Sequence, residues 1–174
     1  MFFCNVKIIK LNMLGNFMKK LKVGLYSFTC CEGCTIVFIE ALNKHFDSWT
    51  SQIEFVDMRV LKPYKGVNKT DVAFCEGAIS TESEVRKLKE IRKKTKHLIA
   101  YGAGASIGFP SDQRNKFDAT KLAAIADDIK RFKQIDKIRP LKDFVKVDDE
   151  ILGCPVDMNV VIAKVEALLK SSGA

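Results

Sequence analysis

The sequence predicts an α/β fold in which a parallel sheet is covered by helices on both faces. Apolar runs of strand length alternate along the chain with longer stretches whose apolar residues recur every three or four positions. This alternation is typical of parallel sheets whose strands are connected by helices. The chain shows no internal repeat and no shift in composition that would indicate a second domain. We therefore expect one domain, with its functional residues at the carboxyl ends of the strands.

Each predicted element has its own local signal. Four short apolar runs are assigned to strands, namely Val23–Phe28, Ile53–Val60, Val72–Cys75 and Leu98–Tyr101. Helices are expected over Gly33–Phe46, from Thr81 to about Lys94, from about Ala119 onward, and over Val156–Lys170. Thr81 and Glu84 have the spacing of a capping box, which marks the start of the second helix. The helix from Ala119 is predicted from a stripe of apolar residues, Leu122, Ile125, Ile129 and Phe132. The stretch from Pro140 to Pro155 is expected to be irregular.

Residues 1–21 are predicted to be an extension that precedes the domain at 22–174. The apolar run Val6–Ile9 has no clear turn into the next strand, and Met18 stands shortly before that strand. These observations fit a translation start assigned too early or a disordered arm. They also fit an extra edge strand or a partner-binding tail, and the sequence leaves the choice open. Cys4 therefore receives no role.

Composition and charge exclude several classes of protein. The chain has 174 residues, 47% apolar and 29% charged, which is typical of a globular domain with a core. Its net charge of +8 is interpreted as a lysine-rich surface, because basic residues are not interleaved with aromatic ones as in a nucleic-acid site. No apolar run approaches the roughly 20 residues that span a bilayer, so no transmembrane segment is predicted.

The six cysteines suggest metal binding. The chain shows no secretion signal, so we expect a cytoplasmic protein whose cysteines are reduced. Clustered cysteines in such a protein favour a metal site over disulfides. Cys30, Cys31 and Cys34 follow the first predicted strand and lie at the start of a helix, where unpaired N–H groups favour thiolates.

Other unusual residues follow the later strands. Cys75 and Glu76 end the third predicted strand, a glycine-rich segment at 102–108 follows the fourth, and Cys154 precedes the last helix. Because the carboxyl ends of parallel strands share one edge of the sheet, we expect these segments to converge. Iron–sulfur clusters are commonly held by four cysteine thiolates, so a cluster is the leading hypothesis.

These segments resemble those of the small subunit of nickel–iron hydrogenases, a family related to the twenty-kilodalton iron–sulfur subunit of respiratory complex I. The matching elements are Cys31-Glu32-Gly33-Cys34, Phe74-Cys75-Glu76-Gly77, Tyr101-Gly102-Ala103-Gly104-Ala105 and Gly153-Cys154-Pro155. They occur in the order and spacing of the family from residue 22 to about residue 157. The resemblance implies a flavodoxin-like, doubly wound sheet.

The resemblance also implies a cofactor and its ligands. Cys31, Cys34 and Cys154 would hold one [4Fe-4S] cluster, but Gly104 stands where the family has a further cysteine. Cys30 and Cys75 are candidates for the fourth ligand, whereas Ser106 offers a weaker oxygen ligand. A [3Fe-4S] cluster, an exogenous ligand and the absence of a cluster also stay open. No cysteine follows Cys154, so a bound cluster would be the only one in this chain.

The function implied is that of an electron-transfer subunit in a hydrogenase-type oxidoreductase. It would relay electrons between a large subunit that carries the nickel–iron site and a further cluster or flavin subunit. Glu76 is expected either to relay protons or to cap a helix. A complex-I-like subunit without nickel is the first alternative, favoured by the pair Cys30-Cys31. A structural or regulatory descendant without a cluster is the second, favoured by Gly104. In each complex, the strand-end rim with Ile107 and Phe109 is expected to be covered by a partner.

Overall fold

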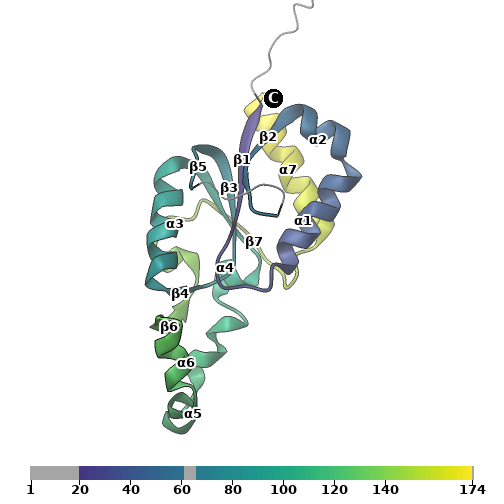
Figure 1. Cartoon of the computed structure of the whole chain (residues 1–174). Helices are drawn as coiled ribbons and strands as arrows, with labels where there is room; N and C mark the ends of the chain where they lie inside the picture. Colours follow the sequence, from purple (N-terminus) through teal and green to yellow (C-terminus); the bar gives the residue numbers. More distant parts are fainter. Residues whose placement is uncertain (1–19, 61–65, 174) are drawn as a thin grey trace, which may run out of the picture.

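A parallel sheet of five strands runs through the centre of the protein (Figure 1). The computed structural model describes residues 20–60 and 66–173. The strands lie in the order β2-β1-β3-β5-β7, and every pairing between neighbours is parallel. They comprise β1 (Leu21–Ser27), β2 (Ile53–Met58), β3 (Thr70–Glu76), β5 (Thr95–Tyr101) and β7 (Asp149–Ile151). The predicted α/β class with a parallel sheet is confirmed.

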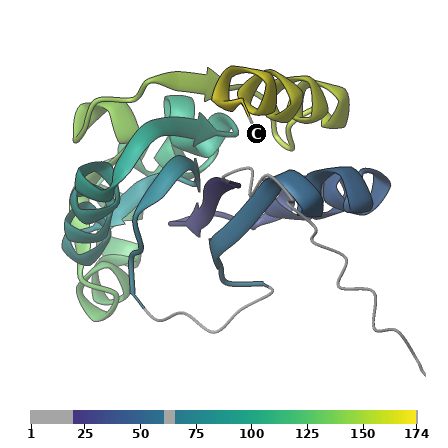
Figure 2. The ribbon, with the colours of Figure 1, turned by 90° about the horizontal axis from the view of Figure 1, so that it is seen from above.

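Helices cover both faces of this sheet (Figure 2). The helices α1 (Gly33–Lys44), α2 (Phe46–Gln52) and α7 (Met158–Ser172) lie on one face, and α3 (Glu82–Lys94) lies on the other. Alternate residues of β3 point to opposite faces, as the pleat of a strand requires. Phe74 accordingly packs in the core beneath α1 and α7, and Cys75 packs in the core beneath α3.

Several element boundaries differ from the prediction. The first helix ends at Lys44, and a separate helix, α2, follows it. The irregular stretch before Pro155 contains the short helix η2 (Leu141–Asp143) and the edge strand β7. The capping box is confirmed, because the Thr81 hydroxyl accepts the Glu84 N–H at 3.2 Å and the Glu84 carboxylate accepts the Thr81 N–H at 3.0 Å. The apolar run Val6–Ile9, considered above as an extra edge strand, lies outside the described residues.

Residues 111–139, called the arm below, extend beyond the end of the sheet (Figure 1). The arm contains η1 (Ser111–Lys116), α5 (Ala119–Ala124), α6 (Ala126–Arg131) and β6 (Gln134–Arg139). Its strand β6 pairs in antiparallel fashion with β4 (Ile79–Thr81), which follows β3. The prediction of one helix from Ala119 was wrong, since the helix breaks at Ile125 and neither half contains a buried residue.

The short helix α4 (Ala103–Ile107) follows β5 and leads into the arm. Its residue Ala105 is fully buried and belongs to the core beneath α3. Within the described ranges, no helix combines the length and apolar character that crossing a membrane requires.

The aromatic ring of Phe38 lies at the centre of the core between α1 and the sheet. It is fully buried, and four aromatic rings surround it. The ring centroids lie at 5.9 Å for Trp49, 6.2 Å for Phe55, 5.2 Å for Phe74 and 6.3 Å for Tyr101. These rings come from α2, β2, β3 and β5, so Phe38 joins α1 to most of the sheet.

We expect Phe38→Ala to lower the free energy of unfolding by about 3–5 kcal/mol, because it removes a buried ring and leaves a cavity. Urea denaturation followed by circular dichroism measures this change. Phe46→Ala is the matched control, since Phe46 is 55% exposed at the start of α2 and its loss should cost about 0.5 kcal/mol or less. Equal losses in the two variants would contradict this description of the core.

Candidate functional site

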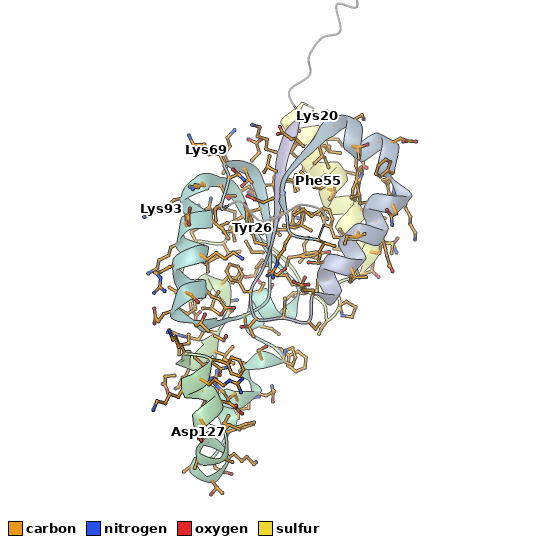
Figure 3. The ribbon with its side chains drawn as sticks, viewed as in Figure 1. Lys20, Tyr26, Phe55, Lys69, Lys93 and Asp127 are labelled. Atoms are coloured by element: carbon orange, nitrogen blue, oxygen red, sulfur yellow. The ribbon has the colours of Figure 1, made fainter. Side chains whose placement is uncertain are left out.

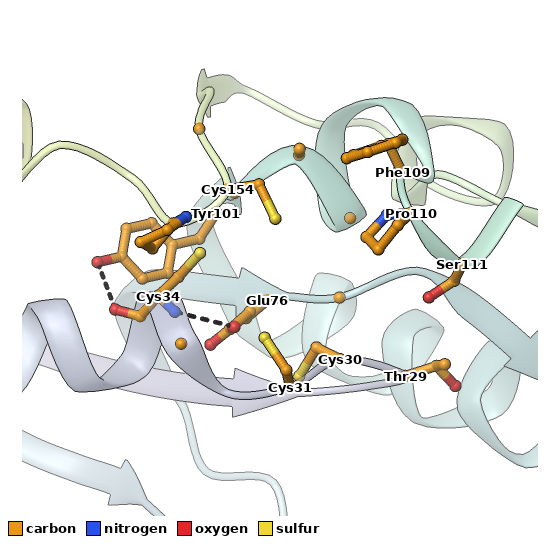
Figure 4. A pocket seen from close by; sticks show the side chains of 17 residues that line it. Thr29, Cys30, Cys31, Cys34, Glu76, Tyr101, Phe109, Pro110, Ser111 and Cys154 are labelled. Carbon is orange, nitrogen blue, oxygen red and sulfur yellow. Dashed lines mark hydrogen bonds between the residues drawn. The ribbon is translucent and has the colours of Figure 1, made fainter. Parts of the chain in front are cut away.

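A cavity of about 400 Å³ opens at the carboxyl edge of the sheet (Figure 4). Its walls come from segments that are far apart in the sequence: residues 29–34 after β1, residues 76–77 at the end of β3, residues 101–104 at the end of β5 and just beyond it, and residues 153–155 before α7. Residues 109–111 at the root of the arm close one side. The segments that were expected to converge therefore do meet at one place.

Four cysteines line this cavity, and Cys75 is not among them. Cys34 is buried, Cys30 is half-buried, and Cys31 and Cys154 are exposed. Figure 4 shows the side chains of Cys31, Cys34 and Cys154 around the carboxyl group of Glu76. Cys30 extends from the neighbouring position of the same loop.

Cys75 is excluded from the cavity by the pleat of β3. Its side chain is fully buried in the core beneath α3, on the opposite face of the sheet from Glu76. Burial raises the pKa of the Cys75 thiol to about 12, as expected for a cysteine that packs as a small apolar side chain. Of the two candidates for a fourth ligand, only Cys30 lines the cavity.

Glu76 holds the N-terminus of α1 in place. Its buried carboxylate accepts the backbone N–H of Cys34 at 3.2 Å, the N–H of Thr35 at 2.9 Å and the hydroxyl of Thr35 at 2.7 Å. The N-cap residue of α1, Glu32, provides no side-chain cap, so a residue of β3 performs that role. The geometry thus supports the helix-capping role considered for Glu76, and its proton-relay role stays a prediction.

Backbone conformation and hydrogen bonds to the backbone fix the segments that carry Cys31, Cys34 and Cys154. Glu32 has a φ of 61°, a left-handed conformation that is unusual for a residue with a side chain and that lies between Cys31 and Cys34. The Tyr101 hydroxyl donates to the carbonyl of Cys34 at 2.9 Å. The N–H of Ala103 donates to the carbonyl of Gly153 at 2.8 Å, which ties the loop of Cys154 to the start of α4.

Two glycines determine the shape of the wall opposite the cysteine turn. Gly102 has a φ of 89°, and a Cβ at this position would lie 2.6 Å from the sulfur of Cys34. A side chain there would displace that sulfur. A Cβ at Gly104 would lie 3.1 Å from the Cα of Gly77, so a cysteine at 104 needs a backbone shift of a few tenths of an ångström.

Burial affects the protonation of two cavity thiols. It raises the pKa of Cys34 to about 11 and, together with the negative charge of Glu76, the pKa of Cys30 to about 12. Both thiols are therefore protonated at neutral pH when no metal is bound. Since thiolates are the species that bind metals, metal binding must release these protons.

The four thiols of the cavity wall are compatible with an iron–sulfur cluster. Among the described residues, no three His, Cys, Asp or Glu side chains converge closely enough to hold one metal ion. Four cysteines nevertheless share the wall of one cavity. A polynuclear iron–sulfur cluster uses thiolates spread around its surface, so the residues present are compatible with a cluster.

Some features of the cavity had no signal in the sequence. Thr29, Pro110 and Ser111 contribute to its walls, and the places of Pro110 and Ser111 depend on how the arm leaves α4. The oxygen ligand considered at Ser106 does not line the cavity. This side chain is fully buried, and its hydroxyl has no hydrogen-bond partner among the described residues.

Comparison with characterised sequences identifies hydrogenase subunits as relatives. Over 161 residues the chain is 28% identical to one subunit of the F420-non-reducing hydrogenase vhu of Methanocaldococcus jannaschii, covering 85% of this chain and 56% of that protein. It is 24% identical to the NAD-reducing hydrogenase HoxS subunit delta of Cupriavidus necator, covering 90% of this chain and 82% of that subunit. The chain thus spans little more than half the length of the methanogen relative.

Comparison with solved structures supports the same fold. A chain in the crystal structure of NAD+-reducing [NiFe]-hydrogenase in the H2-reduced state superposes with a TM-score of 0.78 at 23% identity, with 88% of this chain and 93% of that chain covered. The model of the family described as NADH ubiquinone oxidoreductase, 20 Kd subunit, matches residues 31–168. This match covers most of the chain and confirms the family resemblance inferred from the cysteine and glycine motifs. The chain therefore belongs to the family of the 20 Kd subunit of NADH ubiquinone oxidoreductase, which includes hydrogenase subunits.

Proposed function

We propose that the chain is the iron–sulfur electron-transfer subunit of a nickel–iron hydrogenase-type complex. The observation that carries the proposal is the meeting of four cysteines from two distant segments in one cavity at the carboxyl edge of the sheet. The hydrogenase subunits among its relatives support the assignment to this kind of complex.

The ligand set that we propose is Cys31, Cys34 and Cys154, with Cys30 as the fourth thiolate. Cys30 lies close to Gly77, since a Cβ at Gly77 would lie 2.9 Å from the Cβ of Cys30. Gly77 in turn lies close to Gly104, the position where the family has a cysteine, since a Cβ at Gly104 would lie 3.1 Å from the Cα of Gly77. When bound, the cluster supplies one-electron transfer. The residues of the chain would hold the thiolates in place, with the start of α4 and Phe109 forming part of the cavity wall.

A complex-I-like cluster subunit that works without nickel is a second candidate. The adjacent pair Cys30-Cys31 favours it, because both residues line the cavity. The two functions differ in the protein that binds at the rim, and both require a cluster. A large subunit that supplies nickel ligands is the partner in the first, and it is absent in the second.

We predict that Cys31→Ser, Cys34→Ser and Cys154→Ser each lose most of the bound iron and the visible absorption of the anaerobically purified protein. A neutral hydroxyl is a poor replacement for a thiolate ligand of iron. Iron and acid-labile sulfide per chain, together with the visible spectrum, are the measurements. Cys30→Ser should also lower the iron content, by about one iron per cluster or more.

Cys75→Ser is the matched control for these variants. It removes a thiol that lies outside the cavity, so iron and sulfide per chain should stay at the wild-type level in the fraction that folds. If the wild-type chain binds no iron after anaerobic reconstitution, the result would instead support a structural or regulatory protein that descends from this family and has lost its cluster. Iron loss in Cys75→Ser but not in Cys30→Ser would reverse the assignment of the fourth ligand.

The rim of the cavity is the proposed contact with the partner subunit. Ile107 and Phe109 are 54% and 44% exposed there, and Leu152 next to the loop of Cys154 is 61% exposed. Apolar side chains gathered around a site are typical of surfaces that a partner covers. The partner that we propose is a large subunit with the nickel–iron site, and a further cluster or flavin subunit accepts the electrons.

We expect the isolated chain to self-associate and Ile107→Asp to weaken its complex with the large subunit. The substitution places a charge in an interface that should bury roughly 2,000 Å² or more. Light scattering of the chain alone and after co-expression gives the masses, and Phe46→Asp provides an exposed control far from the rim. A stable monomer whose pairing ignores Ile107→Asp would count against the subunit assignment.

A further inference from the structure

The two helices at the tip of the arm have no buried core of their own. Its helices α5 and α6 have six residues each and contain no buried residue. Leu122 is 39% exposed and Phe132 is 57% exposed. Helices this short are not stable alone in water, because most helical stability in proteins comes from packing an apolar face. The arm therefore carries apolar side chains that are suited to packing against another protein.

The base of the arm, in contrast, is firmly built. The buried guanidinium of Arg114 donates to the side-chain oxygen of Gln134 and to the carbonyls of Ile135 and Asp136, the last at 3.0 Å. Asn115 exchanges two hydrogen bonds with the backbone of Ile138, at 2.7 and 2.9 Å. These bonds also occupy backbone groups of β6 that an added strand would need. Contact with another protein should therefore involve the side chains of the tip.

The arm begins at the cavity. Phe109 and Pro110 line the cavity wall immediately before η1, and β4 follows the Glu76-Gly77 segment of the same wall. Figure 3 shows Asp127 at the tip of the arm, at the end of the molecule opposite Lys20, Lys69 and Lys93. A protein that covers the mouth of the cavity thus comes within reach of the arm.

The exposed apolar side chains are concentrated in this part of the molecule. Of the ten large apolar side chains that are exposed among the described residues, five lie between 107 and 132: Ile107, Phe109, Phe117, Leu122 and Phe132. They extend in sequence from the rim to the tip. This part of the chain therefore carries half of the large exposed apolar side chains, which makes it the leading candidate for a binding surface.

Basic groups accompany the exposed rings of the arm. The guanidinium of Arg131 lies 5.5 Å from the ring centroid of Phe132, and the ammonium of Lys121 lies 5.9 Å from that of Phe117. Basic residues also outnumber acidic ones between 111 and 139. A partner surface complementary to the arm would combine an apolar groove, which receives the rings, with carboxylates at its border, which face the basic groups.

We infer that the arm docks, through Phe117, Leu122 and Phe132, on the same partner subunit that covers the cavity, in an apolar groove bordered by carboxylates. This inference rests on the proposed function, because it takes the large subunit as that partner. The arm then adds a second contact area to the rim. It fixes the orientation of the partner about the cavity as well as its position.

The test compares two exposed phenylalanines in the full chain, co-expressed with the nickel–iron large subunit of the same organism. Phe132→Asp should weaken the complex by about tenfold or more, since aromatic anchors carry much of the binding energy of an interface. Phe46→Asp changes a side chain of nearly equal exposure, 55% against 57%, and should leave the dissociation constant within about twofold. Leu122→Asp should act like Phe132→Asp.

Iron per isolated chain and the circular dichroism spectrum separate docking from folding. Both should equal the wild-type values in Phe132→Asp, and Phe132→Ser provides a variant without an added charge. If the wild type binds the large subunit and the arm variants bind equally well, the inference about the arm is overturned while the proposed function stands. If the wild type itself fails to bind the large subunit, the proposed function fails. The inference is also overturned if the arm variants bind the large subunit normally and lose binding only to a different protein.

Discussion

The buried carboxylate of Glu76 is the contact on which the site depends. It extends from the end of β3 and accepts three hydrogen bonds from the first turn of α1. A carboxylate that is removed from water is costly unless donors surround it, and a helix N-terminus supplies such donors together with a favourable dipole. This interaction holds Cys34 against the wall formed by Gly102 and the loop of Cys154, so two distant segments of sequence keep their thiols in one cavity.

The parallel sheet could be predicted because each central strand contains a short apolar run and because helices with clear periodicity follow β1 and precede β5. The strand β7 could not, because it has three residues and its sequence, Asp149-Glu150-Ile151, has only one apolar side chain. The arm was missed for a different reason. The stripe Leu122, Ile125, Ile129 and Phe132 has the period of a helix that packs on a sheet, but a sequence pattern does not specify whether the packing surface belongs to the same chain.

The convergence of Cys31 and Cys34 with Glu76 could be predicted from their places at strand ends. Cys154 was expected there from its place before the last helix and from the family motif Gly153-Cys154-Pro155. The choice between Cys30 and Cys75 needed the structure, because it depends on the face of β3 to which one side chain points. Glu76 and Cys75 are neighbours in sequence and lie on opposite faces. The close approach of Gly77 and Gly104 also had no signal in the sequence, since it reflects the distance between two backbones.

Gly77 and Gly104 lie against each other, so the space at one position depends on the backbone of the other. Gly77 cannot readily acquire a side chain, since its φ is 92° and a Cβ there would lie 2.7 Å from the carbonyl oxygen of Thr29. A cysteine at 104 would meet the backbone of Gly77, so it fits only where α4 or the Gly77 segment moves by a few tenths of an ångström. The residue that position 104 can hold is therefore set by how closely α4 packs on the end of β3.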